Sequence, residues 1–259
     1  MILRVNDLSF SYGSRRVLHD INFDVREGEF LSVLGPNGVG KSTLFRCILG
    51  NLKGYGGTVT VDGDDLRSLS HREKARRIAY IPQVHRPTFG YSVLDMVLMG
   101  TSRQLSSFAQ PGEEQIRIAT DALTQIGVAH LADRDFSHLS GGEQQLVLVA
   151  RAIAQQANIL VMDEPTSALD DGNQIRVLQK VTKLSQEGYT VLLSTHNPQH
   201  AMSFADRILA LAGGTVAAIG TPAETLTPEL MEKLYSIEVD FVETPVGRMI
   251  QPVMGGSGL

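Results

Sequence analysis

The stretch that decides the fold lies near the N-terminus and reads Gly35-Pro36-Asn37-Gly38-Val39-Gly40-Lys41-Ser42. Residues 30–34 before it are apolar and predict a buried strand, and residues 43–49 after it predict a helix. Glycines allow backbone N–H groups to converge on phosphate oxygens, and the start of a helix adds the positive end of its dipole. A strand, this loop and a helix in succession therefore predict a phosphate-binding P-loop.

The last two residues of the loop indicate what the phosphates belong to. Lys41 would reach the terminal phosphates of a nucleoside triphosphate as a point charge, and the Ser42 hydroxyl would be a ligand for Mg²⁺. The alternative, a glycine turn with a surface lysine, does not account for the flanking strand and helix. We therefore expect the chain to bind a nucleoside triphosphate.

Composition narrows the class of protein. The 259 residues are 42% hydrophobic and carry a net charge of −5, so the basic footprint of a nucleic-acid binder is missing. No apolar run reaches the roughly 18 to 20 residues of a membrane-spanning helix, and no secretory signal is evident. The single cysteine, Cys47, excludes an internal disulfide and agrees with a reducing cytosol. His196 and His200 are spaced i, i+4 without a third ligand, so no zinc site is expected.

Strand-like and helix-like segments alternate along most of the chain. Strands are predicted at 2–34, 58–61, 78–81, 159–162, 190–194 and, as a hairpin, 207–219. Helices are predicted at 71–77 behind a capping box of Ser70 and Glu73, and at 143–155, 175–186, from Asn197, and at 227–235. This alternation predicts a mainly parallel sheet covered on both faces. The site is expected at the carboxyl ends of the strands, where Gly35, Asp163 and Ser194 fall.

The pattern changes over residues 84–140, where strand-like runs vanish. Apolar residues there recur at helical spacing, namely Ile116, Ala119, Leu123 and Ile126. We predict a mostly helical insertion in this region, with a loop around 106–112. The tail is rich in glycine and proline, and residues 255–258 predict a loose end.

Two carboxylates end one of the predicted buried strands. Asp163 and Glu164 directly follow the apolar residues 159–162. A buried charge is costly unless a cation or another partner compensates it. Two adjacent acids at the end of a buried strand therefore need a physical explanation. Asp163 would help to hold Mg²⁺, and Glu164 could take the proton of an attacking water. The alternative, two acids at the start of a surface loop, is disfavoured once the P-loop is accepted.

A second glycine-containing helix start reads Ser140-Gly141-Gly142-Glu143-Gln144. Taken alone, it is either a weak anion site or an N-capped helix. It cannot serve the same phosphates that residues 35–42 already enclose. One P-loop and one further phosphate-binding helix start suggest that two chains face each other.

With these motifs in this order, the chain resembles the nucleotide-binding subunit of an ATP-binding cassette (ABC) transporter from residue 1 to about residue 240. The resemblance implies one ABC ATPase domain over 1–259, of the P-loop NTPase class. Its mainly parallel sheet core and N-terminal antiparallel β subdomain would occupy 1–83 and 141–240. An inserted helical subdomain would occupy 84–140, and a tail 241–259.

The resemblance also implies roles for residues around the nucleotide. Tyr12 matches the aromatic that stacks on adenine, and residues 35–43, which end at Thr43, match the P-loop. Gln83 matches the glutamine that contacts Mg²⁺ and senses the membrane partner. His196 matches the switch histidine that contacts the γ-phosphate. Taken singly, Tyr12, Gln83 and His196 are better explained as a core aromatic, a loop amide and a surface imidazole, but their joint occurrence in this order around the P-loop makes coincidence negligible.

Further matches concern hydrolysis and the contact between two copies. Asp163 and Glu164 match the Walker B acids, with Glu164 as the catalytic base. Ser140, Gly141 and Gly142 match the signature that completes the site of the opposite subunit. The loop that crosses the dimer seam is matched by Ser167, Ala168, Leu169 and Asp170.

Two residues depart from the family pattern. Glu143 stands where the signature usually has glutamine, and Leu146 stands where arginine is common. Some family members carry glutamate at the first position. The arginine usual at the second is not a phosphate ligand, so we expect altered packing between subdomains rather than lost activity.

The resemblance implies a set of partners and a place in the cell. Two copies would sandwich two ATP molecules with Mg²⁺ and pull on two integral membrane permease subunits, served by a periplasmic or lipoprotein substrate-binding protein. The chain would then lie at the cytoplasmic face of the inner membrane.

The substrate class is suggested by one stretch. Residues 81–83 and 89–100 resemble the importers of iron–siderophore complexes, haem and cobalamin, a subfamily that includes molybdate/tungstate importers. Within this subfamily, the molybdate type is slightly favoured by residues 91–100, Phe108 and Leu146. The alternatives are an ABC exporter, a soluble ABC ATPase of DNA repair or translation, and a non-hydrolysing scaffold. The long coiled-coil insertion or second cassette of the soluble class is missing.

Overall fold

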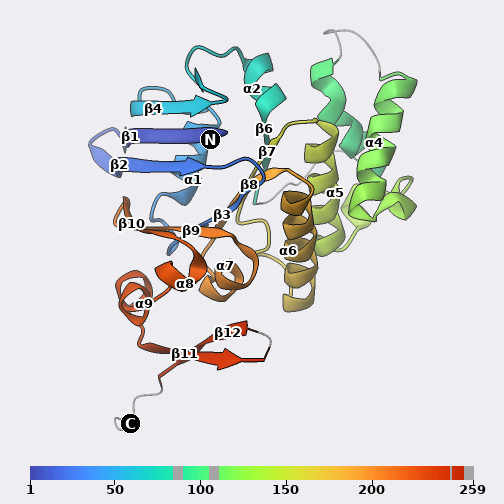
Figure 1. Cartoon of the computed structure of the whole chain (residues 1–259). Coiled ribbons are helices and arrows are strands. Elements are labelled where there is room, and N and C mark those ends of the chain that lie inside the picture. The colour runs from blue at the N-terminus through green and yellow to red at the C-terminus, as the bar shows by residue number, and fades with distance from the viewer. Residues whose placement is uncertain (84–89, 105–110, 246, 254–259) are drawn as a thin grey trace.

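The computed structural model describes residues 1–83, 90–104, 111–245 and 247–253 (Figure 1). Its strands form a four-stranded sheet, a six-stranded sheet and a two-stranded C-terminal sheet. Among the described residues, no helix combines the length and the apolar character that crossing a membrane requires. Phe89, Phe108, most of the predicted loop at 106–112 and the predicted loose end at 255–258 lie outside the described residues.

The six-stranded sheet is the centre of the fold and has the order β10-β9-β3-β8-β7-β6. Its strands are β3 (Phe30–Leu34), β6 (Ile78–Ile81), β7 (Ile159–Asp163), β8 (Thr190–Thr195), β9 (Arg207–Ala212) and β10 (Thr215–Gly220). Neighbouring strands are parallel except β9 and β10, which form the predicted hairpin. The predicted mainly parallel α/β core is confirmed. Because Ser194 pairs with Val33 on one side and Asp163 on the other, the carboxyl ends of β3, β8 and β7 lie side by side.

An antiparallel sheet lies beside this core and contains the N-terminus (Figure 1). It consists of β1 (Leu3–Tyr12), β2 (Arg15–Val25), β4 (Gly56–Val61) and β5 (Asp64–Asp65), in the order β2-β1-β4-β5. Its apolar side chains share a buried cluster with β3 and with helix α1 (Lys41–Ile48). Cys47 of α1 is fully buried there, and burial raises the pKa of its thiol to about 12.

Most of the helical region packs against one long helix. The helices are α3 (Val93–Leu98), α4 (Glu113–Ile126) and α5 (Gly141–Ala154), with short 3₁₀ helices at Met99–Gln104, Ala129–Leu131 and Phe136–His138. Their apolar faces form one cluster that continues onto the parallel sheet. The described part of the insertion is therefore helical, as predicted. The predicted apolar face of α4 is wrong at one position, because Ile116 is 43% exposed and Ile118 is buried instead.

The remaining helices are α2 (His71–Arg77), α6 (Asp171–Gln186), α7 (Pro198–Phe204), α8 (Pro222–Thr225) and α9 (Pro228–Tyr235). The predicted capping box opens α2: the backbone N–H of Glu73 donates to the Ser70 hydroxyl, and that of Ser70 donates to the Glu73 carboxylate. The helix predicted from 175 begins four residues earlier, because the Asp170 side chain accepts from the N–H of Asn173 and caps it.

Two C-terminal features were not predicted. Helix α8 follows the cap residue Thr221, and strands β11 (Val239–Thr244) and β12 (Gly247–Pro252) form an antiparallel hairpin in the region predicted as a tail. The hairpin lies against α7 and α9 (Figure 1).

Candidate functional site

The P-loop has a backbone that only glycine accommodates at two points. Gly40, the N-cap of α1, has φ of 114°, and a Cβ there would lie 2.9 Å from a methyl of Leu18. A Cβ on Gly35 would lie 2.7 Å from the carbonyl oxygen of Leu211. The loop is therefore pressed against β2 and β9, which fixes its shape at the start of α1. The loop leads directly into the N-terminus of α1, where the positive end of the helix dipole favours an anion.

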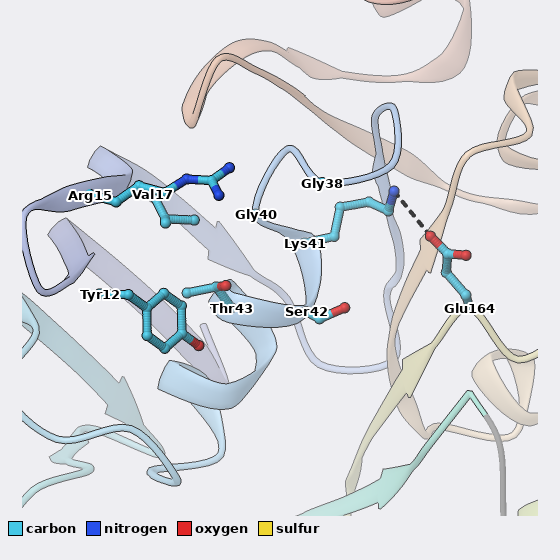
Figure 2. Close-up of a pocket in the computed structure, with 9 residues that line it drawn as sticks. All are labelled: Tyr12, Arg15, Val17, Gly38, Gly40, Lys41, Ser42, Thr43 and Glu164. Atoms are coloured by element: carbon cyan, nitrogen blue, oxygen red, sulfur yellow. Dashed lines mark ion pairs between the residues drawn. The ribbon is translucent and has the colours of Figure 1, made fainter.

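Lys41 lies under this loop with a side chain that is almost fully buried. Its ammonium donates to the carbonyl oxygens of Gly35, at 2.7 Å, and Pro36, at 3.1 Å. The same nitrogen lies 3.1 Å from Oε1 of Glu164 (Figure 2). Figure 2 shows the lysine extending from α1 towards the end of β7, so the P-loop and the carboxylate belong to one site.

The two acids at the end of β7 are held by a serine of the neighbouring strand. The Ser194 hydroxyl donates to Oδ1 of Asp163 at 2.7 Å and accepts from the N–H of Glu164 at 2.9 Å. Asp163 is 7% exposed, whereas Glu164 has φ of 45°, a strained value for a residue with a side chain. At this turn the Asp163 carboxylate contacts Ser194, whereas the Glu164 carboxylate contacts Lys41 and His196. The sequence placed Ser194 at this edge but assigned it no role.

Glu164 is the point at which several predicted residues meet. Its Oε2 lies 3.4 Å from Nδ1 of His196 and 3.5 Å from Nε2 of Gln83. The Gln83 amide also donates to the hydroxyl of Ser167 at 3.0 Å, and that hydroxyl donates to the backbone oxygen of Glu164 at 3.1 Å. Lys41, Gln83, Glu164, Ser167 and His196 thus form one hydrogen-bonded and ionic network.

A cavity of about 470 Å³ opens in front of the P-loop (Figure 2). Its lining consists of Tyr12, Arg15, Val17, Gly38, Gly40, Lys41, Ser42, Thr43 and Glu164. Tyr12 is 45% exposed and meets Phe10 edge to face, with 4.9 Å between the ring centroids. A face of its ring is therefore accessible at the end of the cavity opposite Glu164. A polar floor and an aromatic end suit a nucleotide.

Arg15 is a site residue that the sequence analysis missed. It pairs with Tyr12 across the first hairpin, and Figure 2 shows its guanidinium directed towards the P-loop. The signal in the sequence is weak, because Arg15 and Arg16 are adjacent and only the strand register decides which of them faces the cavity.

The signature residues lie apart from this cavity within one chain. Ser140, Gly141 and Gly142 start α5, and none of the three is among the residues that line the cavity. A Cβ on Gly142 would lie 2.6 Å from Asn173, and one on Gly141 would lie 3.0 Å from Leu169. The signature therefore packs closely on the segment that includes Leu169 and the start of α6.

The two departures from the family pattern have clear local environments. Glu143 accepts from the N–H of Ser140, at 2.9 Å, and from its hydroxyl, at 2.8 Å, and these hydrogen bonds lower the pKa of the Glu143 carboxyl. Leu146 is half-buried and packs against the apolar cluster of the helical region.

The donor set beside the loop fits a hard divalent cation. Ser42, Gln83 and Asp163 offer hydroxyl, amide and carboxylate oxygens, which Mg²⁺ prefers. Among the described residues, no group of three or more His, Cys, Asp or Glu side chains could hold a metal ion. A cation held by these three side chains would keep coordination positions open for other oxygen ligands, as is usual for Mg²⁺.

Comparison with known proteins agrees with this geometry. The family model for ABC transporters matches residues 18–167. An uncharacterised ABC transporter ATP-binding protein of Haemophilus influenzae is 40% identical, covering 97% of this chain and 95% of that protein. The hemin import ATP-binding protein of Thermobifida fusca is 39% identical, covering 95% and 86%. The iron(3+)-hydroxamate import ATP-binding protein of Bacillus subtilis is 33% identical, covering 94% and 91%.

Solved structures give the same result. One, described as an inward-facing conformation of an ABC transporter assigned to the metal-chelate type, superposes with a TM-score of 0.86 at 35% identity, covering 97% of this chain and 96% of that one.

Proposed function

This chain belongs to the ABC transporter family and is an ATPase, and we propose that it is the subunit that energises a bacterial importer of metal chelates. The observation that carries the ATPase part is the position of Glu164, whose carboxylate lies between Lys41 and His196 at the edge of the nucleotide cavity. The importer part is supported by relatives named for hemin and iron-hydroxamate import, which match over more than nine tenths of the chain.

The residues predicted to form the site have distinct roles in the proposed reaction. Backbone N–H groups of the P-loop and the Lys41 ammonium bind the phosphates of ATP, and Tyr12 stacks on adenine. Ser42, Gln83 and Asp163 would hold Mg²⁺ through oxygen atoms, and the ion would neutralise charge on the phosphates. Ser194 fixes the Asp163 carboxylate for this role.

Hydrolysis needs a base for the attacking water. Glu164 is the carboxylate that reaches the cavity, and its Oε2 is the oxygen shared with His196 and Gln83. We assign it as the base, with His196 as the group that contacts the γ-phosphate. Glu164 contacts both the P-loop lysine, Lys41, and the switch histidine, His196. A movement of either side chain would therefore shift its carboxylate.

The signature completes the site of a second copy. Ser140, Gly141 and Gly142 of one chain contact the γ-phosphate held by the other, and residues 167–170 line the seam. ATP then contacts both chains only in the closed dimer, so its differential affinity for that state supplies the driving force for closure. Hydrolysis removes this affinity, and the dimer reopens.

The dimer acts on membrane partners. Two integral permease subunits dock on the paired chains at the cytoplasmic face of the inner membrane, and a periplasmic or lipoprotein binding protein delivers the substrate. Haem, iron–siderophore complexes and cobalamin are the proposed substrate class, and molybdate or tungstate is the second candidate because of residues 91–100. An exporter or a soluble ABC ATPase is not favoured by the relatives.

Uptake by the whole transporter tests this proposal. The tagged chain is purified from detergent-solubilised membranes together with accompanying integral membrane proteins, and the complex is reconstituted in vesicles. Haem, a ferric hydroxamate, cobalamin and molybdate are then supplied in turn, each together with the binding protein of the system, on the side opposite ATP. We expect ATP-dependent movement of a metal chelate towards the ATP side, abolished by Glu164→Gln. Movement away from that side, or of molybdate alone, would contradict the proposal.

A further inference from the structure

The switch histidine is hydrogen-bonded by a residue from far along the chain. The Tyr235 hydroxyl, at the end of α9, donates to the backbone carbonyl oxygen of His196 at 3.0 Å. The family model ends at residue 167, so this contact lies outside the part of the chain that the model matches. Tyr235 does not line the nucleotide cavity.

The chemistry of Tyr235 restricts what its hydroxyl can do. Burial, and to a smaller extent the Glu164 carboxylate, raises the pKa of Tyr235 well above its usual range. The phenol therefore stays protonated across the working pH range and keeps one proton to donate. The hydroxyl donates this proton in its hydrogen bond to the backbone carbonyl oxygen of His196. It therefore acts as a fixed hydrogen-bond donor rather than as an acid or a base.

His196 needs such a support because its own side chain is poorly packed. The imidazole is 47% exposed and contacts Glu164 at 3.4 Å. It follows β8 directly and precedes the cap residue of α7, so its position depends on the backbone at this turn. The Tyr235 hydrogen bond fixes that backbone at the carbonyl of His196 itself.

A second C-terminal contact, from β12, holds the start of α7, the helix that follows this turn. The N–H of Ile250 in β12 donates to the Gln199 side chain at 3.0 Å, and the Gln199 amide donates to the carbonyl oxygen of Arg248 at 3.3 Å. Gln199 lies in the first turn of α7. The segment that carries His196 is thus bonded to both α9 and β12.

We propose that Tyr235 is a positioning residue for ATP hydrolysis, which holds His196 in register with Glu164 through its carbonyl group. This inference rests on the roles proposed above for His196 and Glu164. It assigns to the C-terminal segment a part in the chemistry of the nucleotide site.

The first test is Tyr235→Phe, which keeps the ring and removes only the hydroxyl. Losing one hydrogen bond that orients a reacting group should lower kcat by about threefold to tenfold, with KM for ATP unchanged. The measurement is steady-state ATPase activity of the full chain over a range of ATP concentrations. A kcat equal to that of the parent would overturn the proposal.

A matched control separates positioning from the stability of α9. The Thr227 hydroxyl caps this helix by accepting from the N–H of Leu230 at 3.2 Å, so Thr227→Ala weakens α9 but leaves the Tyr235 hydroxyl in place. We expect the parent kcat for this variant. A loss equal to that of Tyr235→Phe would assign the effect to helix stability and overturn the proposal.

A double variant tests the coupling directly. If Tyr235 acts through His196, Tyr235→Phe should cause no further loss in a His196→Ala background, whereas independent effects would multiply. The single variants His196→Ala and Glu164→Gln are measured alongside. Normal turnover in those two would overturn the site roles and this inference together. Slow turnover in them with normal turnover in Tyr235→Phe would overturn this inference alone.

Discussion

The ammonium of Lys41 lies 3.1 Å from the carboxylate of Glu164, so the phosphate-binding loop and the end of β7 are joined by an ion pair. Both side chains are largely buried, at 4% and 13% exposed. A buried pair of this kind is weak support for stability, because desolvation offsets much of its attraction. Its value here is chemical, since a bound phosphate would compete with Glu164 for the same ammonium.

Lys41→Ala should weaken ATP binding by about 10- to 100-fold, the size expected for losing charge-assisted hydrogen bonds to phosphate. Titration calorimetry or a fluorescent nucleotide measures the affinity. The control is Lys183→Ala, because Lys183 is an exposed lysine of α6 that pairs with Glu187. Unchanged ATP affinity in Lys41→Ala would contradict the assigned phosphate site.

Glu164→Gln should leave ATP affinity close to that of the parent and slow hydrolysis by about 10²- to 10⁴-fold, because the amide cannot accept the proton of water. Single-turnover hydrolysis gives the rate, and the exposed Glu113→Gln serves as the control. If Glu164→Gln turned over at the parent rate, another group would have to be the base.

Ser194→Ala should lower the free energy of unfolding by about 1–3 kcal/mol, because it removes the partner of the Asp163 carboxylate and of the Glu164 N–H. Urea unfolding measures the change. Ser32→Ala is the matched control, since Ser32 is a buried serine of β3 whose hydroxyl has no hydrogen-bond partner among the described residues. An equal decrease in the free energy of unfolding in the two variants would show that the hydrogen bonds of Ser194 do not contribute to stability.

Glu143→Gln should affect stability in a pH-dependent way. The hydrogen bonds from Ser140 lower the pKa of Glu143 in the folded chain, so its stabilising effect is present above the unfolded pKa and is lost as pH falls through the lowered value. The parent should therefore be the more stable protein at pH 7, and the difference should vanish in acid. Unfolding midpoints at a series of pH values check this, and a constant difference would contradict it.

The sequence predicted best where the signal is local. The helix behind Ser70 and the hairpin around Gly213 have the predicted positions because capping and turn chemistry act within a few residues. The start of α6 was missed because its first turn, Asp171 to Asn173, is polar and is specified by the Asp170 cap. The hairpin of β11 and β12 was missed because its strands bury little, so they lack a clear alternation.

The candidate site was predicted as a set of residues, but its internal contacts were not. Lys41 lies beyond the end of β3 and Glu164 directly follows β7; β8 separates these two strands in the sheet, and nothing in the spacing of the sequence shows that order. The same holds for Tyr235 and His196, which are 39 residues apart. Arg15 became visible only once the register of the first hairpin was known.

Sedimentation velocity of Glu164→Gln with ATP and Mg²⁺ tests the central claim most directly, because the claim is that ATP joins two copies through the signature of each. The account predicts a dimer that forms only with ATP and is lost when Ser140→Arg is added. A protein that stays monomeric at saturating ATP, or a dimer that Ser140→Arg leaves intact, would contradict it.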